Sequence, residues 1–275
     1  MTVQISDDFN LDKIADSGQC FRWTKTGSLS YRIIAGRSCL YITELGNDRY
    51  ELDCTEDEYN SFWIDDFDLR ENYRSIRRRI DPQQNPFLLK ASENEKGIRI
   101  LRQDPWETLV TFIISQNKNI PAIRRCVELL SESCGDRKKD KRGMDYYAFP
   151  EPEAILTLSE GDLMSCKLGY RWKYVHAAAE AVMAGAVDLE LLKGADEKTT
   201  VSALTNLFGV GVKVANCVSL FGLHHIDAFP KDVWIKRILE QEYSEGYPFE
   251  EYSPYNGIYQ QYMFAYYRHN AVKRH

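Results

Sequence analysis

The pattern of apolar and polar positions changes once along the chain. Before about residue 55, short alternating stretches of β-branched and aromatic residues are separated by glycines at 27, 36 and 46. Glycines at this spacing are typical of turns between strands. Strands are predicted over residues 19–24, 29–35, 38–43 and 49–53. The first part of the chain is therefore expected to form an antiparallel meander.

Beyond residue 103 the apolar period is that of a helix. Asp104, Pro105 and Glu107 supply a cap, a first-turn proline and an acid three positions after the cap, and together they predict a helix that begins at Pro105. Its apolar stripe has helical spacing and consists of Trp106, Leu109, Val110, Ile113 and Ile114. Further helices are expected from Pro121 onward and over residues 159–169, 172–183, 200–208, 212–221, 233–240 and 257–267. The Lys- and Arg-rich loop 136–145 has nothing to bury and is predicted to be a flexible insertion.

These patterns predict an α+β fold. An N-terminal antiparallel sheet domain with associated helices is expected over residues 1–95, followed by a mainly helical body over residues 96–275 with a helical hairpin at 207–215. The C-terminal helix is placed so that it can pack back on the N-terminal domain.

Composition narrows the class of protein. The 275 residues are 44% hydrophobic and 28% charged, which is ordinary for a globular protein and excludes long disorder or a coiled coil. No apolar run approaches the roughly 18 residues that cross a bilayer, so no membrane association is expected. The seven cysteines form no C-x-x-C pair and the five histidines lack paired spacing. Reduced thiols in a cytoplasmic protein are therefore expected, with no metal.

The net charge of −6 is unusual for a nucleic-acid binder, but its distribution is uneven. Residues 44–68 hold ten acidic residues and one basic residue, so the remainder of the chain is net positive. Basic clusters lie at residues 74–79, 137–142 and 268–275. An acidic pI therefore does not exclude a basic face.

Two predicted helices meet at residues 207–215, where Gly209 and Gly211 allow a tight hairpin whose free amides can hold a phosphate. A Gly-capped turn between two core helices is the alternative interpretation. Lys213 favours a functional site over a plain turn, because a lysine in the first turn of a helix opposes the helix dipole and is poorly placed for a structural role. A nucleophilic amine benefits there, since the dipole disfavours its cationic form.

In its ordered motifs the sequence resembles the 8-oxoguanine DNA glycosylase/AP lyase family, within the helix-hairpin-helix superfamily of base-excision enzymes. The resemblance spans most of the chain, and its motifs are residues 18–23, 101–105, 115–120, 168–171, 209–217 and 229–233. It implies a bifunctional enzyme that needs no cofactor and acts on duplex DNA containing 8-oxoguanine.

The resemblance also implies roles for two catalytic residues. Lys213 matches the nucleophile that attacks C1′ of the damaged nucleotide and forms an imine with the opened sugar. Asp232 matches the aspartate that stabilises the cationic sugar. Taken alone, Asp232 resembles an N-cap, because it stands directly before the apolar residues of the next helix, and the two roles are compatible.

Base recognition carries over to four residues. Phe264 and Cys217 match the two faces of a sandwich around the extruded base, Gln260 matches the residue at its Watson–Crick edge, and Gly18 matches the glycine whose carbonyl accepts N7–H of 8-oxoguanine. Guanine has a lone pair at N7, so such a site rejects the normal base. Without the resemblance, Phe264 and Cys217 would be interpreted as core residues.

On the opposite strand, Asn117 and Tyr170 match residues beside the gap left by the extruded base, and Arg171 matches one of two arginines that read the orphaned cytosine. A turn asparagine and a core tyrosine are the alternatives for the first two. The chain departs from the family at Ala122, in place of the second arginine, and at Trp234, in place of a histidine that contacts phosphate.

We therefore expect a monomeric enzyme that excises 8-oxoguanine from double-stranded DNA and cleaves the strand by β-elimination, located with the nucleoid in a bacterium or in the nucleus of a eukaryote. Two alternatives remain: a sister glycosylase for another damaged base, and a non-catalytic helix-hairpin-helix module that only binds DNA. The pairing of Lys213 with Asp232 disfavours the second, because phosphate binding needs neither residue.

Overall fold

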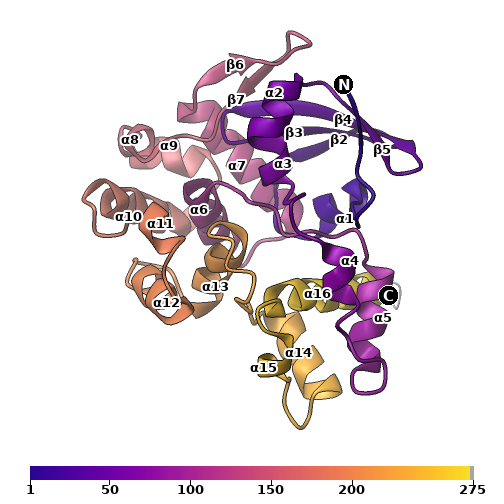
Figure 1. The fold of residues 1–275 in the computed structure, drawn as a ribbon. Helices are drawn as coiled ribbons and strands as arrows, with labels where there is room; N and C mark the ends of the chain where they lie inside the picture. The colour runs from indigo at the N-terminus through magenta and orange to yellow at the C-terminus, as the bar shows by residue number, and fades with distance from the viewer. Residues whose placement is uncertain (273–275) are drawn as a thin grey trace.

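Five strands form one antiparallel sheet in the order β1-β5-β4-β3-β2 in the computed structural model, which describes residues 1–272 (Figure 1). Alternate residues of the central strands, such as Ile33, Leu40 and Ile42, point into a buried cluster beneath the sheet. Asn47 and Asp48 both have positive φ, as a tight hairpin turn between two strands requires. The strands are β1 (Thr2–Gln4), β2 (Trp23–Gly27), β3 (Ser30–Ala35), β4 (Ser38–Gly46) and β5 (Arg49–Leu52).

The helices of the first hundred residues are short. They are α1 (Leu11–Asp16), α2 (Glu56–Glu58), α3 (Ile64–Asp66), α4 (Tyr73–Arg77) and α5 (Pro86–Asn94), and one π-helical turn at Tyr59–Trp63 joins α2 to α3. Trp63 and Phe67, at the end of this run, close the cluster beneath the sheet.

The rest of the described chain is mainly helical. It comprises α6 (Pro105–Ser115), α7 (Ile120–Cys134), α8 (Pro152–Leu156), α9 (Glu160–Ser165), α10 (Trp172–Met183), α11 (Leu189–Leu192), α12 (Glu197–Thr205), α13 (Val212–Phe221), α14 (Val233–Glu242), α15 (Phe249–Tyr252) and α16 (Asn256–Val272), with a 3₁₀ turn at Gly169–Arg171 and the strands β6 (Arg137–Lys139) and β7 (Asp145–Tyr147). The α+β prediction is confirmed. No helix among the described residues is both long and apolar enough to span a membrane.

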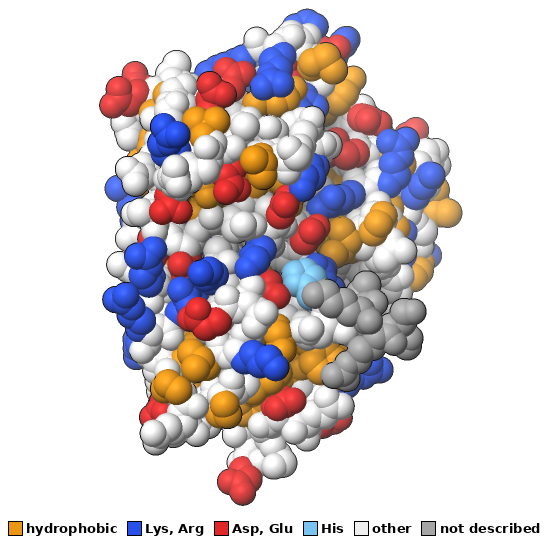
Figure 2. Space-filling view, turned by 90° about the vertical axis from the view of Figure 1, so that its right-hand side faces the viewer, with side chains coloured by type: hydrophobic (Ala, Val, Ile, Leu, Met, Phe, Trp, Pro, Cys, Tyr) orange, Lys and Arg blue, Asp and Glu red, His pale blue; other side chains and the backbone are white. Residues whose placement is uncertain are grey.

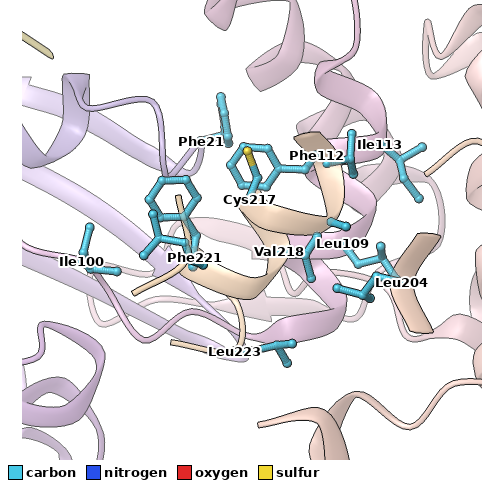
Figure 3. Packing of buried hydrophobic residues seen from close by; sticks show 14 of the residues in the cluster. Phe21, Ile100, Leu109, Phe112, Ile113, Leu204, Cys217, Val218, Phe221 and Leu223 are labelled. Atoms are coloured by element: carbon cyan, nitrogen blue, oxygen red, sulfur yellow. The ribbon is translucent and has the colours of Figure 1, made fainter. Parts of the chain in front are cut away.

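A second, larger hydrophobic cluster fills the helical body, with α13 at its centre. Phe112 of α6 stacks on Phe221 of α13 with ring centroids 5.5 Å apart, and Phe21 meets Phe112 edge-on (Figure 3). Ile76 of α4 and Leu88 of α5 belong to this cluster rather than to the one beneath the sheet. α16 lies against α5, so the end of the described chain packs on an element from its first third (Figure 1).

The predicted strand over residues 19–24 is wrong, because the chain turns there and β2 begins only at Trp23. The polar side chains of this segment are buried and make tertiary hydrogen bonds. Gln19 donates to the Arg99 carbonyl at 2.8 Å, and Arg22 donates to Glu128 at 3.1 Å. The polar positions that alternate with apolar ones in this segment are therefore not the solvent face of a strand. They are buried groups that bind other elements.

The flexible insertion predicted at 136–145 is also wrong, since this segment forms most of the β6–β7 hairpin that packs on the sheet. Asp140 is buried at its turn, where it accepts hydrogen bonds from Tyr41 and from the backbone of Met144 and pairs with Arg32 at 3.1 Å. The Arg142 guanidinium lies 3.6 Å from the centroid of the Tyr41 ring. The hairpin is ordered because the sheet supplies the partners for its charges.

Several basic residues of the clusters seen in the sequence form ion pairs with carboxylates of the same chain, so their charges are partly neutralised. Arg77 is buried between Asp8 and Glu93, and Arg137 and Lys139 both pair with Asp145. On the face drawn in Figure 2, acidic and basic side chains are intermingled. The last three residues of the basic tail, 273–275, lie outside the described residues.

Candidate active site

The helical hairpin consists of α12, a turn and α13. Gly209 in the turn has a φ of +81°, and a Cβ built there would collide with the ring of Tyr174, so only glycine fits. Gly211 is the N-cap of α13 and has open space beside it, and no side chain caps the first amides of α13. Phe208 and Val212, on either side, are exposed. The turn therefore presents backbone donors to solvent at the positive end of a helix dipole.

Lys213 projects from the first turn of α13. The side chain is exposed, and its Nζ lies 5.4 Å from the centroid of the Phe112 ring. Cys217 follows one helical turn later and is buried beneath the amine, where burial raises the pKa of its thiol and the neighbouring Lys213 ammonium partly offsets this effect. The site thus places an exposed amine at the edge of an apolar floor, whose residues Phe112, Cys217 and Phe221 are drawn in Figure 3.

Asp232 is the N-cap of α14. Its Oδ1 accepts a hydrogen bond from the backbone amide of Ile235 at 2.8 Å, which confirms the cap predicted from the sequence. The carboxylate is half-buried and lines the same cavity as Lys213. Two charged groups from different helices therefore converge on one site.

This cavity has a volume of about 50 Å³ and lies between α13, α14, α16 and the segment after α1. It brings together all six residues that the sequence assigned to catalysis and base binding. Its lining consists of Ser17, Gly18, Phe112, Lys213, Cys217, Phe221, Pro230, Asp232, Gln260, Gln261 and Phe264.

Gln260 carries an unpaired acceptor in this lining. Its side chain is 4% exposed, and its Nε2 donates to the Pro230 carbonyl at 3.0 Å. Its Oε1 is buried and has no hydrogen-bond partner among the described residues. A buried acceptor without a donor costs about 1–3 kcal/mol, so this oxygen favours a ligand with an N–H group.

Gly18 lies beside the Phe264 ring in the cavity wall. Its φ is +82°, and a Cβ built on it would be 3.6 Å from Cε1 of Phe264. A side chain at this position would therefore be both strained and in contact with the ring, whereas glycine leaves the backbone open to a flat ligand.

A second cavity, of about 480 Å³, lies on the other side of Lys213. Three lysines, Lys213, Lys231 and Lys236, line it together with one carboxylate, that of Glu197. Val212 and Asn216 of α13 form part of its wall. Cationic side chains and the exposed hairpin amides are thus adjacent, which is the arrangement expected of a surface that binds phosphates.

Asn117, Tyr170 and Arg171 form a separate group near the hairpin. Asn117 has a φ of +52° and donates to the Tyr170 hydroxyl at 3.3 Å, and the Tyr170 ring is 50% exposed. Arg171 is only 6% exposed, because its guanidinium donates to the Gln116 carbonyl and lies 4.4 Å from the Tyr170 ring centroid. Gln116 in turn donates to the Gly209 carbonyl at 3.1 Å, so it links this group to the hairpin.

The two departures from the family occupy defined places. The backbone amide of Ala122, in the first turn of α7, donates to the Asn119 cap at 3.0 Å. Trp234 is half-buried against Tyr267 and lies beneath Arg237. Neither residue offers a cationic donor.

No sequence pattern indicated that Phe112, Gln116 and Gln261 belong to the site. Phe112 was hidden within the apolar stretch of α6, although the structure places it under the Lys213 amine. Gln116 and Gln261 act through backbone carbonyls that are distant in the sequence, so no local pattern reveals them. Among the described residues, no group of three His, Cys, Asp or Glu side chains is arranged to hold a metal ion.

Comparisons with known proteins cover nearly the whole chain. Residues 2–109 match the family model for the N-terminal domain of 8-oxoguanine DNA glycosylase, and residues 110–246 match the model for the HhH-GPD superfamily of base excision DNA repair proteins. Over 235 residues the chain is 30% identical to the N-glycosylase/DNA lyase OGG1 of Arabidopsis thaliana, an alignment that covers 81% of this chain and 63% of the plant protein. The chain thus spans less than two thirds of the length of this curated relative.

Two solved structures share the fold over almost their full length. MBOgg1 in complex with a low-affinity DNA ligand superposes with a TM-score of 0.91 at 36% identity, covering 98% of this chain and 96% of that one. The 8-oxoguanine glycosylase/lyase of Clostridium acetobutylicum, in complex with double-stranded DNA containing cytosine opposite 8-oxoguanine, superposes with a TM-score of 0.89 at 32% identity, covering 98% of each chain.

Proposed function

This chain belongs to the 8-oxoguanine DNA glycosylase family, and from that premise we propose that it is a bifunctional DNA glycosylase and AP lyase that excises 8-oxoguanine from duplex DNA. One observation carries the proposal. An amine, a carboxylate and a buried unpaired acceptor line a single cavity, and they belong to Lys213, Asp232 and Gln260.

Lys213 acts as the nucleophile. Its nitrogen attacks C1′ of the damaged nucleotide, the bond from C1′ to the base breaks, and the base leaves with the electron pair and takes up a proton. The sugar ring then opens to give an imine on Lys213. Loss of a proton from C2′ breaks the bond from C3′ to oxygen and expels the 3′ phosphate, which is β-elimination. Side chains carry every step, so we propose no cofactor.

Asp232 stabilises the positive charge that develops on the sugar. Its carboxylate lines the cavity while the Ile235 amide holds one oxygen in place. A charged group fixed before the reaction needs no reorganisation when charge develops in the transition state.

The extruded base occupies the narrow slot between Cys217 and Phe264. Gln260 Oε1 accepts from the donors on its Watson–Crick edge, which guanine and 8-oxoguanine share. The Gly18 carbonyl accepts N7–H, which only the oxidised base has. Gln260 therefore selects the purine type, and Gly18 selects the lesion.

The remaining contacts are made with the DNA backbone and the opposite strand. The amides around Gly209 and Gly211, together with the lysine-lined cavity, hold phosphates. Asn117 and Tyr170 occupy the gap left by the extruded base, and Arg171 reads the orphaned base with donors released from the Gln116 carbonyl. We propose that the protein acts as a monomer wherever the cell keeps its DNA, in the nucleoid or the nucleus.

Borohydride trapping tests the proposal. The protein is incubated with a duplex that contains 8-oxoguanine opposite cytosine, the imine is reduced, and the cross-linked peptide is mapped. We expect a covalent adduct on Lys213 and no adduct in Lys213→Gln. Lys25→Gln is the matched control, because Lys25 of β2 pairs with Asp12 and lines neither cavity, so we expect it to trap normally.

An adduct on another lysine, or excision of the base without any trapped product, would contradict the role of Lys213. A parallel panel of duplexes with alkylated bases and oxidised pyrimidines tests the substrate. If one of these is excised faster than 8-oxoguanine, the protein is a sister glycosylase with a different lesion.

A further inference from the structure

The C-terminal end of α1 lies directly before Gly18 and is held by three side chains from the helical body. Arg124 of α7 donates to the Ala15 carbonyl at 3.0 Å, Arg268 of α16 donates to the Asp16 carbonyl, and Gln261 of α16 donates to the Ser17 carbonyl at 2.6 Å. The last carbonyls of a helix have no partner within it, so these bonds satisfy three successive orphan acceptors. We call these three donors the α1 clamp.

Side-chain hydrogen bonds made by both neighbours of Gly18 also hold its backbone in place. The Ser17 hydroxyl donates to the Ile14 carbonyl at 2.7 Å, and Gln19 Nε2 donates to Ser17 Oγ at 2.9 Å. Gln19 Oε1 accepts from the Leu101 amide at 2.9 Å. Both neighbours of Gly18 are 1% exposed. The backbone at Gly18 is therefore held from before and after, and two of its restraints come from α16.

The two α16 members of the clamp share a helix face with the stacking ring. Gln261, Phe264 and Arg268 are spaced i, i+3 and i+7, so their side chains lie along one stripe. The Arg268 guanidinium lies 5.6 Å from the centroid of the Phe264 ring, and its Nη1 would be 3.9 Å from a Cβ built on Gly18. One helix face thus sets both the base-stacking ring and the loop opposite it.

A rigid backbone at Gly18 matters because the two bases differ there at a single atom, N7, which carries a hydrogen in 8-oxoguanine but not in guanine. A carbonyl oxygen faces N–H in 8-oxoguanine and a lone pair in guanine. A site rejects the wrong partner only if its polar groups cannot move away from the repulsion. A loop free to shift would accept both bases.

We propose that Arg268 and Gln261 are positioning residues for lesion discrimination, which hold the Gly18 carbonyl at a fixed place relative to the Phe264 ring. This inference rests on the proposed function. It assigns a specificity role to two residues outside the catalytic pair, and it separates them from Arg124, whose contact lies farther from Gly18 and does not reach the ring.

The test compares excision of 8-oxoguanine with excision of guanine, both opposite cytosine, under single-turnover conditions. We expect Arg268→Gln and Gln261→Leu to lower the ratio of the two rates by about tenfold, the effect of weakening one hydrogen bond. Arg268→Lys retains a cationic donor, so we expect it to restore most of the ratio. Arg124→Gln is the matched control, because it removes a donor from the same helix end, and its ratio should equal that of wild type.

Cleavage of a preformed abasic site supplies a second readout. This substrate has no base to recognise, so its rate should remain within a few-fold of wild type in Arg268→Gln, Arg268→Lys and Arg124→Gln. A merely structural role would lower both activities together and would affect Arg124→Gln as strongly as Arg268→Gln. If Arg268→Gln fails to fold, Gln261→Leu and Arg268→Lys decide the outcome.

Ratios in Arg268→Gln and Gln261→Leu that equal the Arg124→Gln ratio would overturn the inference while leaving the proposed function intact. A wild-type protein that cleaves abasic sites but does not excise 8-oxoguanine would instead overturn the proposed function.

Discussion

At the scale of single residues, Asp232 is both the N-cap of α14 and part of the wall of the cavity that Lys213 lines. The sequence alone could establish only the cap, since a cap is a local pattern. Its position beside Lys213 depends on how α13 and α14 pack, which no local pattern encodes. No local pattern encodes the environment of Gln260 either. The Pro230 carbonyl accepts from its Nε2, and this contact leaves its Oε1 buried without a partner among the described residues.

Asp232→Asn separates the two roles. Asparagine caps a helix about as well as aspartate but has no charge. We therefore expect a melting temperature close to wild type and excision slowed by about 10²-fold or more, the loss typical when one electrostatic stabiliser is removed. Single-turnover excision and thermal melting, measured on the same preparation, check this. Lower stability with normal excision would show that Asp232 is only a cap.

Ala122 offers a second prediction at this scale. It has no donor for an orphaned base, and Arg171 is mostly buried against the Gln116 carbonyl. We expect 8-oxoguanine to be excised best opposite cytosine, with a smaller penalty for other partners than two arginines would impose. Ala122→Arg should sharpen the preference, since a good bidentate pair discriminates by about 1–3 kcal/mol.

The measurement is single-turnover excision opposite each of the four bases, in wild type and in Ala122→Arg. Strict dependence on cytosine in the wild type would show that Arg171 suffices and would remove the reason for loose selectivity.

At the scale of elements, the sequence predicted best those helices whose limits are set locally. The bounds of α10 and α13 agree with the prediction, and α6 begins at Pro105 as its cap requires. α12 begins earlier than predicted, because Asp196 caps it by accepting from the Thr199 amide. The segment at 19–24 and the β6–β7 hairpin could not be predicted, because their polar side chains find partners far away in the chain.

The β6–β7 hairpin gives a prediction about stability. Asp140→Ala would leave the Tyr41 hydroxyl and the turn amides of Arg142 and Met144 without their acceptor. We expect a loss of about 2–4 kcal/mol, because unpaired buried groups each carry a penalty. Denaturant unfolding measures it.

Asp145→Ala is the control for this prediction. Asp145 makes only exposed ion pairs, with Arg137 and Lys139, so its removal should change stability by less than about 1 kcal/mol. Equal losses in the two variants would mean that the hydrogen bonds of the buried Asp140 carboxylate add nothing to stability.

At the scale of the whole molecule, the sheet and the helical body meet around a cavity of about 220 Å³. Asp66 lines it and is buried, and its carboxyl has a buried oxygen without a partner among the described residues. Burial raises the pKa of Asp66 to about 8 and that of Glu107 to about 7. The other charged groups around this cavity are Arg22, Arg102, Asp104 and Lys193.

A raised carboxyl pKa makes stability depend on pH. The folded protein keeps the Asp66 proton up to about pH 8, whereas the unfolded chain loses it near its ordinary value, so stability falls as pH rises between these limits. Asp66→Asn cannot ionise and should gain melting temperature relative to wild type between pH 5 and pH 8, by about 2–4 °C for each kcal/mol.

Asp65→Asn is the control, because Asp65 pairs with Arg70 on the surface and should show no such trend. A melting difference between Asp66→Asn and wild type that stays constant across this pH range would contradict the prediction.

The position of α16 has a consequence for the order of synthesis. The hairpin and Lys213 leave the ribosome before residues 256–272, which carry Gln260, Gln261 and Phe264. Until then the emerging chain has the proposed nucleophile but lacks α16, which forms one wall of the cavity and packs on α5. A product of premature termination within this interval would keep Gly18, the glycine turn and the Lys213 amine. It would lack Gln260 and Phe264, which are proposed to bind the base, and the α16 donors that hold the backbone before Gly18. Under the proposed function, the growing polypeptide therefore acquires its nucleophile before it acquires the α16 residues that bind the base.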